Sequence, residues 1–492
     1  MSNQIIELSK NWTIDGLIDI IENKSNISLG SDCIEKIKIN RTYLESKLKS
    51  GGIFYGINTG FGSLCNTIIN DSELDLMQKN LVISHACGTG YMIDEKTSQL
   101  IFLLKIINLS KGHSGVRLTL VDHMIHIYNM GIYPVIYEQG SLGASGDLAP
   151  LAHLSLLLIG EGQCYYKGQI NEVKDIFEKL HIDKLELKEK EGLALLNGTQ
   201  FSLAHAVISL DKARRALNWS NKIAAASLHA FCGSLSPFHH LISDIRNNRD
   251  QSTIASIISE YCFDMKEMKK YSVQDPYSFR CIPQVHGASL TAINHVEMVI
   301  ENELNAITDN PNIFHEEDMI LSGGNFHAQS LALVMDYLSI AISEIASISE
   351  RRIYQLINGD RELPPFLVDH SGLNSGFMIV QYTAASIVSQ NKQLSTPTSV
   401  DSIVSSKGQE DHVSMAANGS TRCIKVSNNT LTVLAMELMV AMQACDYRDV
   451  SLFSTFVKNL HEDYRKYISF LDKDRILHVD IMNSLNYINR LK

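Results

Sequence analysis

The sequence has little proline, and its cysteines form no pattern. Nine prolines occur among 492 residues, about 1.8%, against an average of about 5%. Because proline breaks helix interiors, its scarcity favours a mostly helical protein with long helices. The nine cysteines are scattered and never form a CxxC pair. That spacing argues against a disulfide framework and a zinc site, so we expect no metal and free, mostly buried thiols in a reducing cytoplasm.

The sequence also lacks a basic region and a long uncharged apolar run. Its 43 basic and 54 acidic side chains give a net charge of −11, which disfavours nucleic-acid and anionic-membrane partners. No uncharged apolar run reaches the roughly 18 residues of a membrane span. The nearest candidate, Leu431 to Cys445, carries Glu437. The N-terminus lacks the basic and apolar regions of a signal peptide, so we expect a soluble, cytoplasmic protein.

Apolar residues are plentiful and recur at helical spacing after residue 200. Hydrophobic residues make up 45% of the chain and charged residues 20%, which excludes extensive disorder. The first 200 residues alternate short apolar runs with glycine-rich turns, so we predict a mixed N-terminal domain over 1–200 and a helix bundle over 201–492. The three apolar stripes of the bundle are Leu203, Val207, Leu210, Ala213 and Leu217; Leu331, Val334, Leu338, Ala341, Ile345 and Ile348; and Leu431, Leu434, Leu438, Ala441 and Cys445.

The most informative stretch is Gly-Ser-Leu-Gly-Ala-Ser-Gly-Asp-Leu-Ala-Pro-Leu, residues 140–151. Its glycines and proline predict a loop that opens toward a helix. A plain turn is one interpretation, and a phosphate-binding loop is another, although the Lys-Ser/Thr of a P-loop is missing. A third interpretation is chemical, because a tight bend lets the Gly146 nitrogen attack the Ala144 carbonyl and close a five-membered ring. Loss of water from the ring and of the Ser145 hydroxyl then leaves the electrophile 4-methylidene-imidazol-5-one (MIO).

This stretch resembles the signature of the histidine, phenylalanine and tyrosine ammonia-lyase family, which builds MIO from Ala-Ser-Gly. Further similar blocks run from Tyr55 to about Arg448, so the resemblance covers nearly the whole chain. It implies a mainly α fold, with a mixed N-terminal region that carries the MIO loop and then a long helical bundle. It also implies a homotetramer with active sites shared among three subunits, and no external cofactor.

The resemblance assigns roles to residues in several other blocks. It implies that Tyr55 removes the β-proton, which requires a pKa lowered from about 10. It implies that Arg280 binds the substrate carboxylate through its planar fork. The implied catalytic residues are Tyr55, Ala144, Ser145, Gly146, Tyr277 and Glu410, and the implied substrate-binding residues are His85, Asn197, Gln274, Arg280, Phe326 and Glu410.

Two positions indicate the substrate. His85, preceded by serine, and Glu410, preceded by glutamine, resemble the histidine-specific branch of the family. An imidazole offers polar nitrogens to such side chains, whereas a phenyl ring leaves a buried carboxylate unpaired. The resemblance therefore implies a carbon–nitrogen lyase that converts L-histidine to trans-urocanate and ammonia. A tyrosine ammonia-lyase, an aromatic 2,3-aminomutase and a non-catalytic helical assembly protein remain the alternatives.

Overall fold

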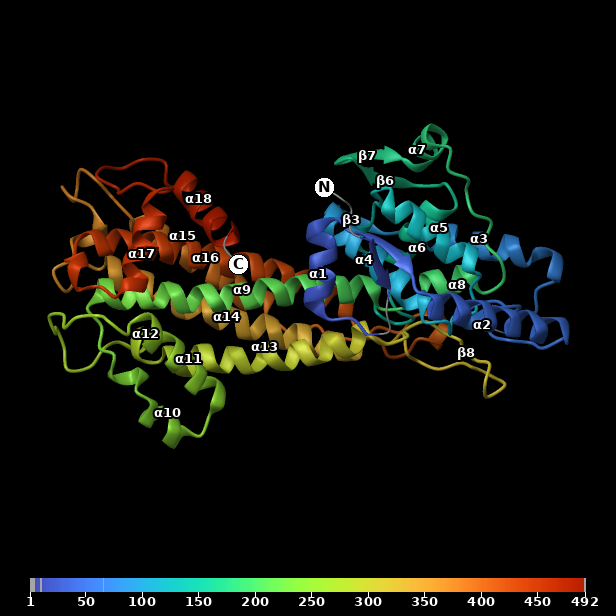
Figure 1. The fold of residues 1–492 in the computed structure, drawn as a ribbon, viewed down its shortest axis with the longest axis horizontal. Helices are drawn as coiled ribbons and strands as arrows, with labels where there is room; N and C mark the ends of the chain where they lie inside the picture. The colour runs from blue at the N-terminus through green and yellow to red at the C-terminus, as the bar shows by residue number, and fades with distance from the viewer. Residues whose placement is uncertain (1–4, 9–10, 65, 491–492) are drawn as a thin grey trace. The chain divides into compact units, whose positions relative to one another are not determined.

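The computed structural model describes residues 5–8, 11–64 and 66–490, which contain eighteen α-helices and nine short strands (Figure 1). The predicted mainly α fold is confirmed. The chain forms two compact units that are discontinuous in sequence. The first unit comprises the described residues up to 208, 298–336 and 397–421, and the second comprises 209–297, 337–396 and the described residues from 422 onward. The domain division at residue 200 stays a prediction.

The first unit combines helices with four small sheets around a helix that is buried almost throughout. This helix, α4 (Glu95–Ser110), follows Asp94, whose carboxylate accepts the Thr97 amide at 3.0 Å and caps its first turn. A polar or charged residue inside such a helix needs a partner within the protein. The other helices of this unit are α1 (Ile14–Asn23), α2 (Ser31–Lys49), α3 (Leu74–His85), α5 (Leu118–Asn129), α6 (Leu148–Leu158), α7 (Val173–Leu180) and α8 (Glu191–Leu196).

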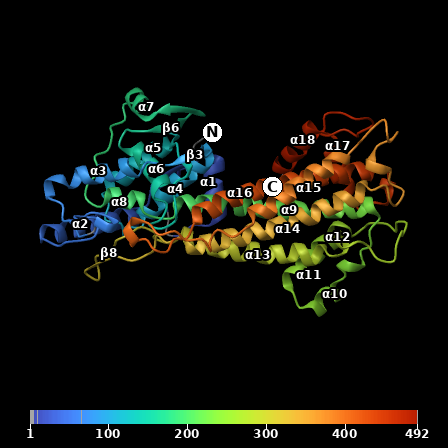
Figure 2. The ribbon, with the colours of Figure 1, turned by 180° about the vertical axis from the view of Figure 1, so that it is seen from behind.

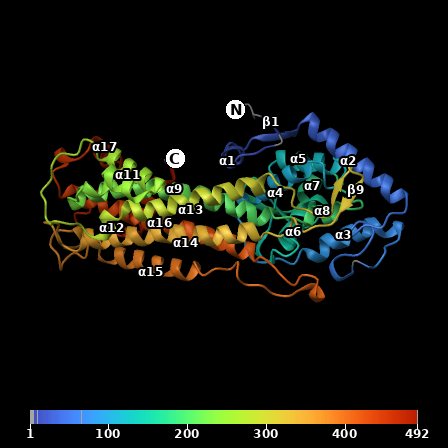
Figure 3. The ribbon, with the colours of Figure 1, turned by 90° about the horizontal axis from the view of Figure 1, so that it is seen from below.

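The strands of the first unit are three or four residues long and mostly antiparallel. The exception is the parallel pair of β1 and β2, in register from Ile5 opposite Asn26. The pair of β8 and β9 belongs to the segment 298–336, where the chain comes back to the first unit. It lies beside α2 (Figure 3), and Asn40 Nδ2 of that helix donates to the Ile313 carbonyl at 3.0 Å. The pairings are β1 (Ile5–Leu8) with β2 (Asn26–Leu29), β3 (Thr89–Met92) with β5 (Tyr137–Gln139), β6 (Gln163–Tyr166) between β4 (Ile132–Pro134) and β7 (Gln169–Glu172), and β8 (Asn312–Phe314) with β9 (Met319–Leu321).

The second unit is a helix bundle. In it α9, α13, α14 and α16 run side by side (Figures 1 and 3), and α10 packs against α11 (Figure 2). Four of its helices begin or end in the first unit: α9 (Gln200–Phe231), α13 (Ile282–Leu304), α14 (Gln329–Ile357) and α16 (Ala416–Asp446). The remaining helices are α10 (His240–Arg246), α11 (Arg249–Tyr261), α12 (Tyr277–Arg280), α15 (Met378–Leu394), α17 (Thr455–Arg465) and α18 (Leu477–Arg490).

All three predicted apolar stripes are buried. They lie on α9, α14 and α16, and each of their residues is 8% exposed or less. One helix of the described chain, Gln329–Ile357, is long and apolar enough to cross a membrane by length and composition. Because 72% of its most apolar window is buried inside the protein, its apolar character is that of a core helix.

Candidate active site

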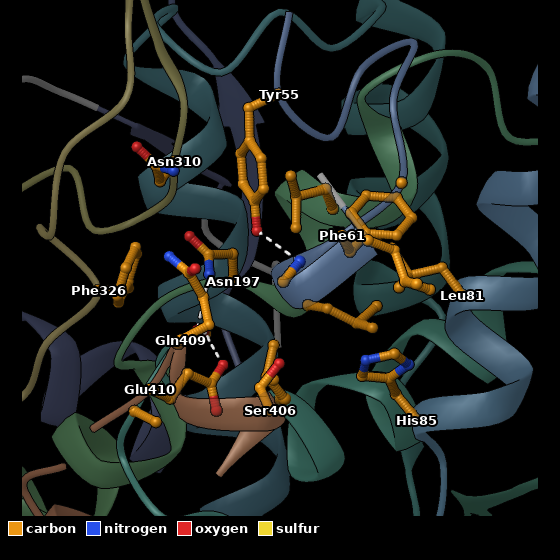
Figure 4. Close-up of a pocket in the computed structure, with 18 of the residues that line it drawn as sticks. Tyr55, Phe61, Leu81, His85, Asn197, Asn310, Phe326, Ser406, Gln409 and Glu410 are labelled. Carbon is orange, nitrogen blue, oxygen red and sulfur yellow. Dashed lines mark hydrogen bonds between the residues drawn. The ribbon is translucent and has the colours of Figure 1, made fainter. Parts of the chain in front are cut away.

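A cavity of about 690 Å³ lies in the first unit, within the usual size range of ligand pockets. Six separate parts of the chain line it: the loop after Tyr55, α3, the Ala144–Ser145 loop, α8, the segment around Phe326 and the segment around Glu410. Figure 4 shows Tyr55, His85, Phe326 and Glu410 around this space. The structure thus brings together residues separated by more than 300 positions in the sequence.

The loop that carries Ser145 is sharply bent and packs against backbone. Gly146 has φ +80°, and a Cβ there would stand 2.3 Å from the Gly198 carbonyl oxygen and 2.6 Å from the Gly198 nitrogen. The next residue, Asp147, donates its amide to the same Gly198 carbonyl at 2.8 Å. Only glycine fits at position 146, both for its left-handed backbone and for this close approach.

Asp147 anchors the loop to the start of α9. Its carboxylate is fully buried and accepts the Ser141 hydroxyl at 2.8 Å, the Ser202 hydroxyl at 2.9 Å and the Ser202 amide at 2.9 Å. Burial raises the pKa of Asp147, and these hydrogen bonds lower it in part. The predicted loop does open into a helix, because α6 begins at Leu148.

The hydroxyl and the carbonyl oxygen of Ser145 both have partners. Its hydroxyl donates to Glu410 Oε1 at 2.6 Å, and its carbonyl oxygen accepts Asn197 Nδ2 at 2.7 Å. In MIO the Ser145 carbonyl becomes the ring carbonyl, so the Asn197 amide is already directed at that atom. Asn197 Oδ1 is buried and has no hydrogen-bond partner among the described residues. The bend at Gly146 and the donor on the Ser145 carbonyl fit the formation of MIO from this loop.

Glu410 is held by a tight turn. Its Oε2 accepts the Ser405 hydroxyl at 2.6 Å, and its carbonyl accepts the Ser405 amide at 2.9 Å. Between them, Ser406 and Lys407 have φ values of +50° and +54°, a conformation that non-glycine residues rarely adopt. The surrounding fold therefore determines where this carboxylate points.

His85 ends α3 and is partly buried at the cavity wall. Its Nδ1 lies 3.1 Å from the Ser84 hydroxyl, which orients the ring. Burial lowers the pKa of His85, and the Glu410 carboxylate raises it in part. The two residues predicted to recognise the substrate ring therefore line one cavity, and the Glu410 charge acts on His85.

Tyr55 and Phe326 complete the lining predicted from the sequence. The Tyr55 hydroxyl accepts the Gly62 amide at 3.0 Å (dashed line in Figure 4). Phe326 is partly buried and faces the cavity from the segment before α14.

The remaining predicted residues, Gln274, Tyr277 and Arg280, belong to the second unit and do not line this cavity in the described chain. They do form a cluster with one another. The Arg280 guanidinium lies 4.5 Å from the centre of the Tyr277 ring. The Gln274 side-chain oxygen, in the amide orientation that satisfies both groups, accepts Arg280 Nη2 at 2.8 Å. Tyr277 is 71% exposed, so the cluster stands at the surface of its unit.

Sequence reasoning missed Lys105, which supports Asn197 from inside the protein. Its fully buried ammonium donates to the Asn197 carbonyl at 2.7 Å and to Gln200 Oε1 at 3.3 Å. Burial lowers the pKa of Lys105 to about 7. The available signal was its place as the one charged residue in the apolar run Leu100–Leu109. Among the described residues, no group of three or more His, Cys, Asp or Glu side chains could hold a metal ion.

Comparison with known proteins shows the family of this chain. A model of the family "aromatic amino acid lyase" matches residues 12–466, and the chain belongs to this family. Histidine ammonia-lyase of Shewanella woodyi is 44% identical over 482 residues, covering 97% of this chain and 94% of the relative. The crystal structure of histidine ammonia-lyase from Trypanosoma cruzi matches with a TM-score of 0.93 at 34% identity, covering 99% and 93%. Tyrosine aminomutase from Streptomyces globisporus matches with a TM-score of 0.93 at 30% identity, covering 99% and 97%.

Proposed function

We propose that this protein is a histidine ammonia-lyase, which converts L-histidine to trans-urocanate and ammonia without oxidation. The observation that carries the proposal is the cavity in which Ser145 of the Ala-Ser-Gly triplet meets Glu410 and His85. Relatives named histidine ammonia-lyase that are 40–44% identical over nearly the whole chain support it. The reaction class is that of a carbon–nitrogen lyase.

Ala144, Ser145 and Gly146 would form the MIO group. Once formed, it supplies an electrophile that binds the substrate amine and turns it into a better leaving group. The chain contributes the bend at Gly146 that brings the reacting backbone atoms together. Asn197 donates to the Ser145 carbonyl and so stabilises negative charge that develops on this oxygen.

Glu410 and His85 would recognise the substrate imidazole. A carboxylate accepts an imidazole N–H, and His85 addresses the other ring nitrogen. A phenylalanine side chain offers no polar atom to either group, so its binding leaves the polar groups of the pocket unpaired. Tyr55, with the Gly62 amide on its hydroxyl, is the proposed base for the β-proton.

The substrate carboxylate would be bound by Arg280, together with Gln274 and Tyr277. These residues form their own cluster in the second unit. As the resemblance implies, we include in the proposal a homotetramer in which one subunit supplies this cluster to the cavity of another. A planar guanidinium gives the bidentate contact that a carboxylate needs.

Histidine-dependent formation of urocanate, followed by near-ultraviolet absorbance, tests this function directly. The same preparation is supplied with tyrosine and with phenylalanine, and the products are separated by chromatography. We expect urocanate from histidine at a much higher kcat/KM than coumarate from tyrosine. Faster production of coumarate would identify a tyrosine ammonia-lyase instead, and a β-amino acid product would identify an aminomutase.

A further inference from the structure

The hydrogen bond between Ser145 and Glu410 bears on how the MIO group forms, before any substrate is bound. Loss of two waters from Ala144, Ser145 and Gly146 consists of two separable changes. In ring closure, the Gly146 nitrogen bonds to the Ala144 carbonyl carbon, and the carbonyl oxygen leaves as the first water with the protons of the Gly146 and Ser145 amides. These atoms belong to the backbone, and the tight bend brings them together.

The second change is the dehydration of Ser145, and it needs an acid. The Cβ–Oγ bond breaks, and the electron pair of the Cα–H bond becomes the new Cα=Cβ bond. The oxygen leaves as water with its own proton and one further proton. Because hydroxide is a poor leaving group, that further proton has to arrive as the C–O bond breaks.

We infer that Glu410 delivers this proton, so that it serves as the general acid of the protein's own maturation as well as the ligand of the substrate ring. Glu410 Oε1 lies 2.6 Å from Ser145 Oγ, which is direct proton-transfer distance. In the carboxylate form it accepts the hydroxyl proton, and in the acid form it donates along the same line. Glu410 takes this proton from water before the C–O bond breaks and is a carboxylate again afterwards, while the Cα proton passes to water in the cavity. Protons therefore balance, and the carboxylate is unchanged overall.

The Asp147 carboxyl, which is the acidic group next to the loop in the sequence, has other partners. It lies two residues along the chain and directs both of its oxygens to Ser141 and Ser202. Glu410 is the carboxylate hydrogen-bonded to the leaving oxygen.

The fold fixes Glu410 relative to the loop. The Met415 amide donates to the Leu142 carbonyl at 2.9 Å, and the Ser414 hydroxyl donates to the Gly143 carbonyl at 2.9 Å. Leu142, Ala144, Val413 and Met415 also pack in one apolar cluster. Two segments about 270 positions apart are therefore joined directly beside the reacting serine.

This inference also gives an order of events, and here it rests on the proposed function. While the Ser145 hydroxyl is present, it occupies Oε1, and Ser405 occupies Oε2. Loss of the hydroxyl frees Oε1 as an acceptor in the cavity. The carboxylate becomes available to a substrate N–H only after maturation is complete.

The test follows the mass of the peptide that spans Ser145 during cell-free synthesis of the full chain, for wild type, Glu410→Gln and Ser405→Ala. We expect wild type to lose two waters. Glu410→Gln, which keeps the size but cannot deliver a proton, should accumulate a peptide that has lost one water, with the second loss slowed about 10²-fold. Ser405→Ala removes the other short hydrogen bond to Glu410 but keeps the acid, so it should lose both waters.

The outcomes separate this inference from the proposed function. Glu410→Gln that loses both waters at the wild-type rate overturns the inference. A variant that loses no water also overturns it, because Glu410 would then act on folding or ring closure instead. Wild-type protein that loses no water at all contradicts the proposed function itself. Mature wild-type protein that makes no urocanate contradicts only the assignment of substrate.

Discussion

At the scale of single residues, the site depends on a relay of hydrogen bonds that begins outside the cavity. Lys105 donates to the Asn197 backbone, and the Asn197 side chain donates to Ser145. Lys105 does not line the cavity but positions a residue that does. Loss of either donor should therefore act on the chemistry at Ser145 without removing a substrate contact made by Glu410 or His85.

Replacement of Asn197 by alanine removes the donor to the Ser145 carbonyl. We expect kcat to fall about 10²- to 10³-fold, the usual effect of removing one donor to an oxygen that gains negative charge. KM for histidine should change much less, because the imidazole ligands remain. Steady-state urocanate formation measures both constants. Mass spectrometry of the Ser145 peptide must show equal maturation, and an unchanged kcat would contradict this role.

Replacement of Lys105 by methionine should change how stability depends on pH. The pKa of Lys105 is lowered from 10.5 to about 7, so between these values the unfolded chain holds more protons on this residue than the folded chain does. The cost of burying the charge is complete below about pH 7 and decreases as the pH rises toward 10.5.

The stability of wild type relative to Lys105→Met should thus rise by up to about 1.4 kcal/mol per pH unit between about pH 7.5 and 9. Urea unfolding of both proteins across this range measures the difference. Lys167→Met is a suitable control for the loss of an exposed lysine. Lys167 lies in the short turn between β6 and β7, and its ammonium lies over the Tyr166 ring. A difference independent of pH would mean that Lys105 keeps an ordinary pKa.

The sequence predicted which residues line the cavity better than it predicted the hydrogen bonds between them. Ala144, Ser145, Asn197, His85 and Glu410 were named from the resemblance, and all five line the cavity. The bond from Ser145 to Glu410 spans 265 positions and has no signature in spacing. Ser405 was missed because a serine in a polar loop carries no signal until the turn that points it at Glu410 is known.

At the scale of elements, periodicity was a dependable guide to long helices. The stripe from Leu331 to Ile348 follows the three-four spacing of one helix face, and α14 buries it. The short strands were not predicted individually, because three or four residues do not define a period of two. The loop before α6 was predicted from its glycines, but its contact with Gly198 depends on a turn 52 residues later.

That contact predicts opposite results for two glycine-to-alanine substitutions with similar backbone angles. Gly146 has φ +80° and a Cβ position blocked by the Gly198 backbone, whereas Gly131 has φ +71° and open space. Gly131→Ala should cost only about 1–2 kcal/mol for its left-handed conformation. Gly146→Ala should displace the loop and abolish maturation.

Thermal unfolding and the mass of the Ser145 peptide measure the two effects. We expect that the Gly131→Ala protein has lost two waters and that the Gly146→Ala protein has lost none. Complete maturation of Gly146→Ala would show that the loop does not need this close approach to Gly198.

At the scale of the whole molecule, the predicted catalytic and substrate-binding residues separate into two sets. Ser145, Glu410 and His85 belong to the first unit, while Gln274, Tyr277 and Arg280 belong to the second. Within the described part of the chain, no arginine lines the cavity. A substrate carboxylate buried there without a cationic partner would be unfavourable, which is why the proposal requires a homotetramer.

Complementation between two inactive variants tests this sharing. Ser145→Ala lacks the reacting hydroxyl, and Arg280→Ala lacks the carboxylate ligand, so each variant alone should be nearly inactive. If one subunit supplies Ser145 and another supplies Arg280, about one site in four of a random one-to-one mixture combines both intact residues. Coexpression with two different affinity tags, followed by sequential purification, isolates mixed oligomers, and their urocanate formation should reach about a quarter of the wild-type rate.

If both residues of a site came from the same subunit, no mixed oligomer could contain an intact site. Inactive mixed oligomers of the correct size would therefore contradict the sharing of sites, while light scattering that finds only monomers would contradict the tetramer.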